Sequence, residues 1–255
     1  MPALLAPHLR FRAIIPTLLC GGVLMFLSDA ARAQVAPGVH IEQIGPDNVA
    51  IVTAGESNSA KVRQSGGNNR AVINSGSGVG NAADLSQSGS NNDTEATVDG
   101  DDNAWAVTQT SDGATNRAEF TQIGSDNRLD ITQDATGLTD GLANFASVSQ
   151  TGSGNTAGIT QTASIAAADF TNRATITQTG SGNTANVVQN GSNNLSEQVQ
   201  EGDGNLSDIV QDGDDNTAIH RQFGNNLDLS GVLGGLTIEQ SGGAHIIIEQ
   251  CANGC

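Results

Sequence analysis

The sequence predicts an all-β fold: a β-solenoid of about nine two-stranded coils, each of about 22 residues, with stacked Asn and Gln ladders. Three observations lead to this prediction. Aromatic residues make up only 3% of the 255 residues and tyrosine is absent, so an ordinary bulky core is not available. A unit that begins with Asn and ends with Gln six positions later recurs along the chain. Within the units, apolar or amide side chains alternate with polar ones, with the period of two that is typical of a β-strand.

The first 33 residues are expected to be a cleaved export signal. Arg10 and Arg12 precede a largely apolar stretch over residues 13–27, and Ala31-Arg32-Ala33 matches the small-x-small pattern of a cleavage site. The apolar stretch is too short for a membrane span. We therefore expect a secreted, extracellular chain that starts at Gln34, passes through the periplasm and has no membrane span after cleavage.

Residues 34–250 are expected to form the repeats. The Asn-x5-Gln unit occurs twelve times, and a linking Gln-x-Gly-x-x-Asn step occurs nine times. In one unit, alternation places Asn103, Trp105, Val107 and Gln109 on a single face of the strand. The inner face is therefore predicted to carry Asn, a small residue, an aliphatic residue and Gln. The residues between units form turns with Gly, which tolerates positive φ.

Stacking the coils places like residues above one another at the strand spacing of about 4.8 Å. Each Asn or Gln side chain can then donate to one neighbouring coil and accept from the other. This satisfies amides whose burial would otherwise cost about 1–3 kcal/mol each. Gln178, Gln189 and Gln200 are expected to share one row. The predicted ladder residues are Asn103, Gln109, Asn116, Gln122, Asn127, Gln133, Asn144, Gln150, Asn155, Gln161, Asn172, Gln178, Asn183, Gln189, Asn194, Gln200, Asn205, Gln211, Asn216 and Gln222.

The end strand and the enlarged turns depart from the regular repeat. The last strand, residues 244–250, contains three consecutive isoleucines and little charge, so it is expected to be a sticky end that favours end-to-end stacking. Enlarged turns are expected over residues 134–143, 162–171 and 223–233. The first two of these, with a smaller addition before them, follow odd-numbered strands and should project from one edge of the solenoid.

Cysteines occur only in the signal and at the end of the chain. A lipoprotein signal at Cys20 is disfavoured, because Leu19 stands where a small residue should precede it. After cleavage, Cys251 and Cys255 remain in a short tail, residues 251–255. Export permits a disulfide between them. Two incidental thiols are the equally open alternative.

These units resemble the curlin repeat, in which Ser or Asn lies six positions before Gln and a Gln-x-Gly-x-x-Asn turn follows. The resemblance extends from Pro37 to Gln250. It implies a structural protein that self-assembles into curli-like amyloid fibres on the bacterial surface, in the biofilm matrix, with a role in adhesion. The implied partners are further copies of the chain, other curli-like subunits, and an outer-membrane secretion channel with its accessory factors.

Several functions are not expected. The net charge of −17 leaves no basic stripe for nucleic acid or for an anionic membrane surface. His40, His220 and His245 are scattered without a nucleophile motif, and neither a phosphate-binding loop nor a zinc spacing occurs, so we expect no enzyme activity, cofactor or metal. His220 is expected on the outer face of its strand, in solvent. Trp105 and Phe120 are expected inside, as local core filler.

Two other classes of function stay open. One is a monomeric solenoid with capped ends, acting as a surface binding module or adhesin. The other, less favoured, is an ice- or calcium-binding solenoid. Residues 99–102 and 212–215 are acidic turns, but calcium prefers about six to eight oxygen ligands in a compact shell, so we expect solvated turns whose like charges hinder premature stacking. An outer threonine column would suit ice binding, but charged residues share that face. Its threonines are Thr108, Thr121, Thr132, Thr160 and Thr177.

Overall fold

The computed structural model describes residues 38–163, 172–227 and 236–251, and these residues form an all-β structure. Their regular elements are eighteen β-strands. The odd-numbered strands are β1 (Val39–Ile44), β3 (Ser59–Gly67), β5 (Ala82–Ser90), β7 (Ala104–Ser111), β9 (Arg128–Ala135), β11 (Thr156–Ala163), β13 (Thr184–Gly191), β15 (Leu206–Asp212) and β17 (Leu236–Ser241). The even-numbered strands are β2 (Val49–Ala54), β4 (Arg70–Ser75), β6 (Asn92–Asp99), β8 (Thr115–Ser125), β10 (Leu142–Ser153), β12 (Asn172–Ser181), β14 (Leu195–Glu201), β16 (Thr217–Phe223) and β18 (His245–Cys251).

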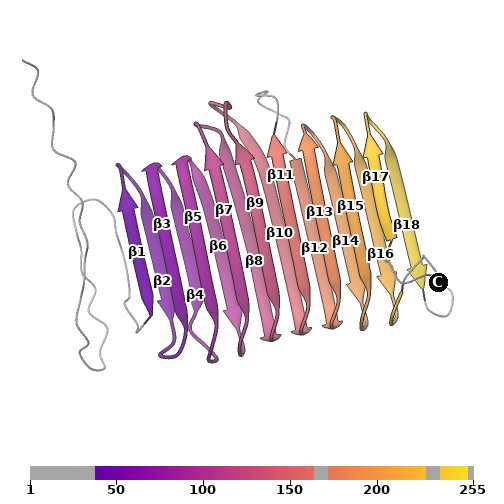
Figure 1. Ribbon diagram of the computed structural model, residues 1–255, viewed down its shortest axis with the longest axis horizontal. Helices are drawn as coiled ribbons and strands as arrows, with labels where there is room; N and C mark the ends of the chain where they lie inside the picture. Colours follow the sequence, from indigo (N-terminus) through magenta and orange to yellow (C-terminus); the bar gives the residue numbers. More distant parts are fainter. Residues whose placement is uncertain (1–37, 164–171, 228–235, 252–255) are drawn as a thin grey trace, which may run out of the picture.

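The strands form two parallel sheets, one from the odd-numbered and one from the even-numbered strands. Each sheet has nine strands in sequence order, so one odd strand and the next even strand make one coil. Figure 1 shows the coils following one another along the long axis, with the two sheets facing each other. The predicted β-solenoid is confirmed. Parallel pairing of strands from successive coils is the arrangement that puts equal positions of the repeat above one another.

The ladder positions keep their register even where the turns are enlarged, although the pairing of β10 with β8 shifts by one residue between Leu142 and Asn144. Gln64 pairs with Gln87 in the next coil, 23 residues later. Asn144 pairs with Asn172, which lies 28 residues later. The extra residues are therefore accommodated in the turns, and the strands keep their pairing. The expected coil length of about 22 residues holds only where the turns are short.

The enlarged turns after β7 and β9 share one edge, as predicted. Their buried residues form a small hydrophobic cluster of their own, which includes Ala114, Ala135, Leu138 and Ala143. The turn after β9 rises above the upper edge of the solenoid in Figure 1. Most of the predicted additions after β11 and β16 lie outside the described residues. A shared apolar cluster explains why these turns cover one another instead of extending into solvent.

The main core is thin and aliphatic. In most of the strands from β2 to β13 it consists of one small and one larger side chain, such as Ala146 and Val148 of β10. Trp105 and Phe120 are 4% and 5% exposed, which confirms their predicted place inside. Their ring centroids lie 4.8 Å apart in an edge-to-face arrangement, one ring from each sheet. Aromatic pairs prefer this geometry, and it fills the space between the sheets at one level of the solenoid.

Candidate functional site: the stacked amide ladders

Buried asparagines link the coils at the corners where strands begin. The Asn144 Nδ2 atom donates to the Asn116 Oδ1 atom of the preceding coil at 2.9 Å, and Asn172 repeats the contact to Asn144 at 3.3 Å. The same side chains bond the backbone: the Asn183 Nδ2 atom donates to the carbonyl oxygen of Gly202 at 2.7 Å. Each asparagine thus bonds both of its neighbouring coils.

Buried glutamines form a second set of ladders with the opposite direction. The Gln150 Nε2 atom donates to Gln178 Oε1 of the following coil at 2.9 Å, and Gln178 donates to Gln200 at 2.9 Å. The Gln178 Nε2 atom also donates to the carbonyl oxygen of Thr156 in the other sheet at 3.0 Å. The glutamines therefore connect coils along the solenoid and also connect its two sheets.

The structure places all twenty predicted ladder residues in the interior, each at most 1% exposed. One expectation was wrong. Gln178 and Gln200 share a row in the even-numbered sheet, but Gln189 lies in the odd-numbered sheet, where it bonds Gln161 and Gln211. Successive units alternate between the sheets, so a row contains every second unit.

The ladders extend beyond the predicted residues. Some of the further members belong to the intact units Asn58–Gln64 and Asn81–Gln87, and most of them stand in the Gln-x-Gly-x-x-Asn step, so both patterns were available signals. These further members are Gln43, Asn48, Asn58, Gln64, Asn69, Asn81, Gln87, Asn92, Gln240 and Gln250. The glutamine row of the even-numbered sheet starts only at Gln122, because Val98 takes that position in β6. The Gln122 Oε1 atom is consequently buried without a hydrogen bond in the described structure.

His220 is inside the solenoid, so the expectation of a solvated histidine was wrong. It is 1% exposed and takes the place that Ile176 fills two coils earlier. Its Nδ1 atom lies 2.6 Å from the Ser207 hydroxyl, and its Nε2 atom lies 2.8 Å from Gln250 Oε1. The fifth position of the unit faces inward by strand alternation, and these two polar partners permit a ring there. Ser207 is also fully buried, so the pair has no access to a substrate.

Burial lowers the pKa of His220, and the hydrogen bond to Gln250 opposes this only in part. Below the ordinary histidine pKa of about 6.5, the unfolded chain binds a proton that folded His220 resists, so stability is lost as the pH falls. We expect His220→Gln to reduce the loss of stability between pH 7.5 and pH 5, by at most about 1.4 kcal/mol per pH unit. Gln198 already occupies the same position one coil earlier.

Guanidinium unfolding at both pH values measures this effect. The matched control is His245→Gln, because His245 is exposed. Equal pH dependence in wild type and His220→Gln would contradict the assignment.

The threonines do not form one column. Thr108, Thr132 and Thr160 stack on the outer face of the odd-numbered sheet, whereas Thr121 and Thr177 lie on the outer face of the even-numbered sheet. The expectation of a single threonine surface was therefore wrong. The physical reason is again the alternation of successive units between two sheets.

The acidic turns have a structural contact that the sequence did not reveal. Asp101, Asp203 and Asp214 each accept a backbone N–H bond from the preceding coil, at 2.8 to 2.9 Å. Carboxylates that accept such bonds help to hold the turns in register. Within the described ranges, no group of three or more His, Cys, Asp or Glu side chains could hold a metal ion.

The C-terminal tail contains Cys251 and Cys255. Cys251 ends β18 and is disulfide-bonded, while Cys255 lies outside the described residues, so their pairing stays a prediction.

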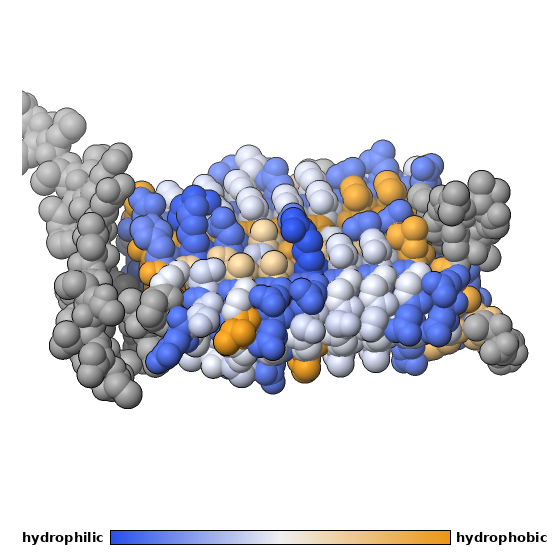
Figure 2. Space-filling model, turned by 60° about the horizontal axis from the view of Figure 1, so that its bottom comes forward, coloured by the Kyte–Doolittle hydropathy of each residue, from blue (hydrophilic) through white to orange (hydrophobic). Residues whose placement is uncertain are grey.

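Figure 2 shows a face on which hydrophilic residues predominate and hydrophobic ones are scattered. The described part of the chain has no helix long and apolar enough to cross a membrane.

Comparison with known proteins agrees with this geometry. A model of the curlin associated repeat matches residues 55–87, 112–134, 140–164 and 171–197. The matched segments contain consecutive strands and ladder residues of the solenoid. The search of curated proteins found no match to the chain. The repeated unit, its parallel stacking and the matched family model together assign the chain to the curlin-repeat family.

Proposed function

We propose that this protein is a secreted structural subunit whose solenoids stack end to end into curli-like amyloid fibres on the bacterial surface. Residues 1–33 would direct its export, residues 34–250 would form the fibre, and residues 251–255 would be a short tail. An outer-membrane channel with accessory factors, and other curli-like subunits, would be its partners. Membership of the curlin-repeat family supports this role.

Both ends of the solenoid have edge strands with one free side, and this observation supports the proposal most directly. Among the described strands, β1 pairs only with β3, and β17 pairs only with β15. An edge strand presents backbone N–H and C=O groups that can pair with another chain. The end strands also present isoleucine: Ile41 is partly buried in β1, and Ile247 of β18 is 69% exposed.

The ladders give the stack a direction. Within the two glutamine rows, each side chain donates to the next glutamine toward the C-terminal end, beginning with Gln43 Nε2, which donates to Gln64 Oε1 at 2.6 Å. A following copy would place the acceptor Gln43 Oε1 above Gln240, and Ile41 above Ile238, if β1 continued the sheet after β17. The same positions of the repeat would then meet as they do inside the solenoid. This matching favours head-to-tail addition.

Electron microscopy and thioflavin-T fluorescence of the purified chain from Gln34 onward test the proposal. We expect fibres after a lag, with a strand repeat of about 4.8 Å by X-ray diffraction. A dye-negative monomer with the circular dichroism of β-strands would contradict assembly and favour the capped binding module or adhesin.

A charge on the inner face of β1 should hinder the stacking of copies while the solenoid itself still folds. Ile41→Asp places a charge on the inner face of β1, where docking of another copy would bury it, so we expect elongation to slow by about tenfold or more. His40→Asp is the matched control, since His40 is exposed on the outer face of the same strand. Circular dichroism establishes that both variants fold. Equal elongation rates in both variants would exclude stacking through β1.

A further inference from the structure

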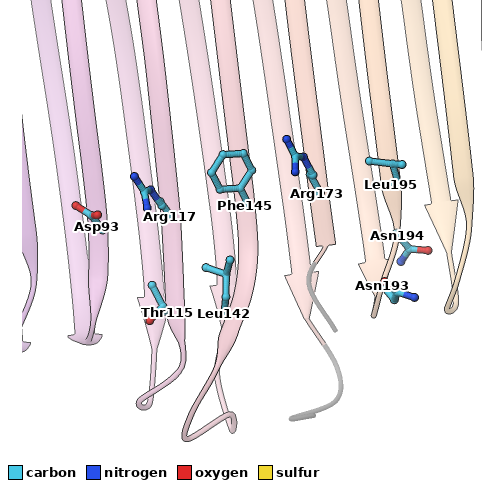
Figure 3. A pocket seen from close by; sticks show the side chains of 9 residues that line it. All are labelled: Asp93, Thr115, Arg117, Leu142, Phe145, Arg173, Asn193, Asn194 and Leu195. Carbon is cyan, nitrogen blue, oxygen red and sulfur yellow. The ribbon is translucent and has the colours of Figure 1, made fainter. Parts of the chain in front are cut away.

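A shallow groove of about 570 Å³ crosses the outer face of the even-numbered sheet, near the starts of β6 to β14. Its centre is a row of three side chains, Arg117 of β8, Phe145 of β10 and Arg173 of β12 (Figure 3). These residues are paired directly across the strands. Because strands lie about 4.8 Å apart, the two arginines stand about 10 Å apart on either side of the ring.

The groove combines an aromatic platform with apolar margins. The Arg173 guanidinium carbon lies 5.2 Å from the centre of the Phe145 ring, within the range of a cation–π contact. Leu142 and Leu195 line the same groove and are 39% and 37% exposed. Asn193 adds an amide from the turn before β14.

The lining of the groove holds two arginines and one aspartate, in a chain whose net charge is −17. Arg117 is paired with Glu119, and Asp93 at the end of the groove is paired with Arg70 at 2.7 Å. Arg173 is exposed and has no ion pair with a carboxylate in the described ranges. Among the described residues of this chain of net charge −17, the Arg173 guanidinium beside the Phe145 ring is therefore not neutralised by a carboxylate. A planar guanidinium is suited to bind a carboxylate with two parallel hydrogen bonds.

We propose that this groove binds an acidic oligosaccharide built from uronic acid units. One sugar ring would lie against Phe145, and carboxylates of the units on either side would bind Arg173 and Arg117, the latter in exchange with Glu119. A linear polymer that repeats an apolar ring face and a carboxylate matches a row that repeats cation, ring and cation.

Fluorescence polarisation of a labelled oligogalacturonate, titrated with the full chain at low ionic strength, tests the proposal. We expect saturable binding that weakens with salt, and binding of a neutral cello-oligosaccharide of equal length to be about tenfold weaker or undetectable. Arg173→Gln should weaken oligogalacturonate binding by about tenfold, and Phe145→Thr should weaken binding of both sugars.

The matched control is Arg128→Gln. Arg128 is also exposed but begins β9 in the odd-numbered sheet, away from the groove, so its replacement should leave the affinity unchanged. Absence of oligogalacturonate binding, or the same loss in Arg128→Gln as in Arg173→Gln, would overturn the proposal. If Arg173→Gln instead reduced only the lateral association of fibres, the groove would be a contact between copies of the chain, and the sugar site would be wrong.

Discussion

Replacing both Gln178 and Gln200 with Glu is expected to lower the free energy of unfolding by about 3–5 kcal/mol per residue or to prevent folding. Both side chains are fully buried and lie in successive coils. Glutamate lacks the amide N–H groups, so the bonds from position 178 to Gln200 Oε1 and to the Thr156 carbonyl are lost. Two carboxylates would also face each other at the strand spacing, where water cannot screen them.

Guanidinium unfolding followed by circular dichroism measures this loss. The matched control is the pair Thr177→Glu and Val199→Glu, which are in register on the same two strands but face outward. The same two charges should there cost less than about 1 kcal/mol. Lowering the pH should restore part of the stability of the buried variant, because protonation neutralises the buried carboxylates.

Because Gln178 and Gln189 lie in different glutamine rows, a second double mutant tests the assignment of the rows. Gln178→Glu with Gln189→Glu places the two charges in different sheets, so their effects should be closer to additive than those in Gln178→Glu with Gln200→Glu. An equal coupling in both double mutants would contradict the assignment of these residues to separate ladders.

Replacing Gly152 with Ala is the second change with a large expected effect, a loss of about 2–4 kcal/mol in the free energy of unfolding. Gly152 has φ 123°, a conformation that residues with a Cβ atom rarely adopt. A Cβ atom there would lie 2.0 Å from the carbonyl oxygen of Gly180 in the next coil. The two coils would have to separate, and the bonds of the neighbouring ladder would lengthen with them.

The matched control for this change lies in the same turn. Gly154 also has positive φ, 65°, but a Cβ atom there would meet nothing closer than 4.0 Å. The equivalent position holds Asn193 at φ 57° and Asp126 at φ 58°. We therefore expect Gly154→Asn to change the stability by less than about 0.5 kcal/mol. A similar loss in the Gly152 and Gly154 variants, measured by thermal or guanidinium unfolding, would show that crowding between coils is not the cause.

Much of this molecule could be predicted from its local pattern. The alternation from Asn103 to Gln109 predicts a strand and its buried face, and both are present in β7. Recurrence of that unit predicts stacking, because identical edges pair best with themselves. His220 shows the limit of reasoning about residue type: the same alternation points it inward, but only the contacts with Ser207 and Gln250 reveal how a polar ring is accommodated.

The repeat, the strands, their inner and outer faces and the resemblance to the curlin repeat all follow from local sequence, because they depend on neighbours within one unit of the chain. Which units share a row became visible only in the folded chain, since that depends on two sheets and on turns of unequal length. The tertiary structure separated Gln189 from Gln178 and brought Arg117, Phe145 and Arg173 together across 28-residue coils. It also gave the asparagine and glutamine ladders opposite directions, because side-chain amides orient only when their partners in neighbouring coils are in place.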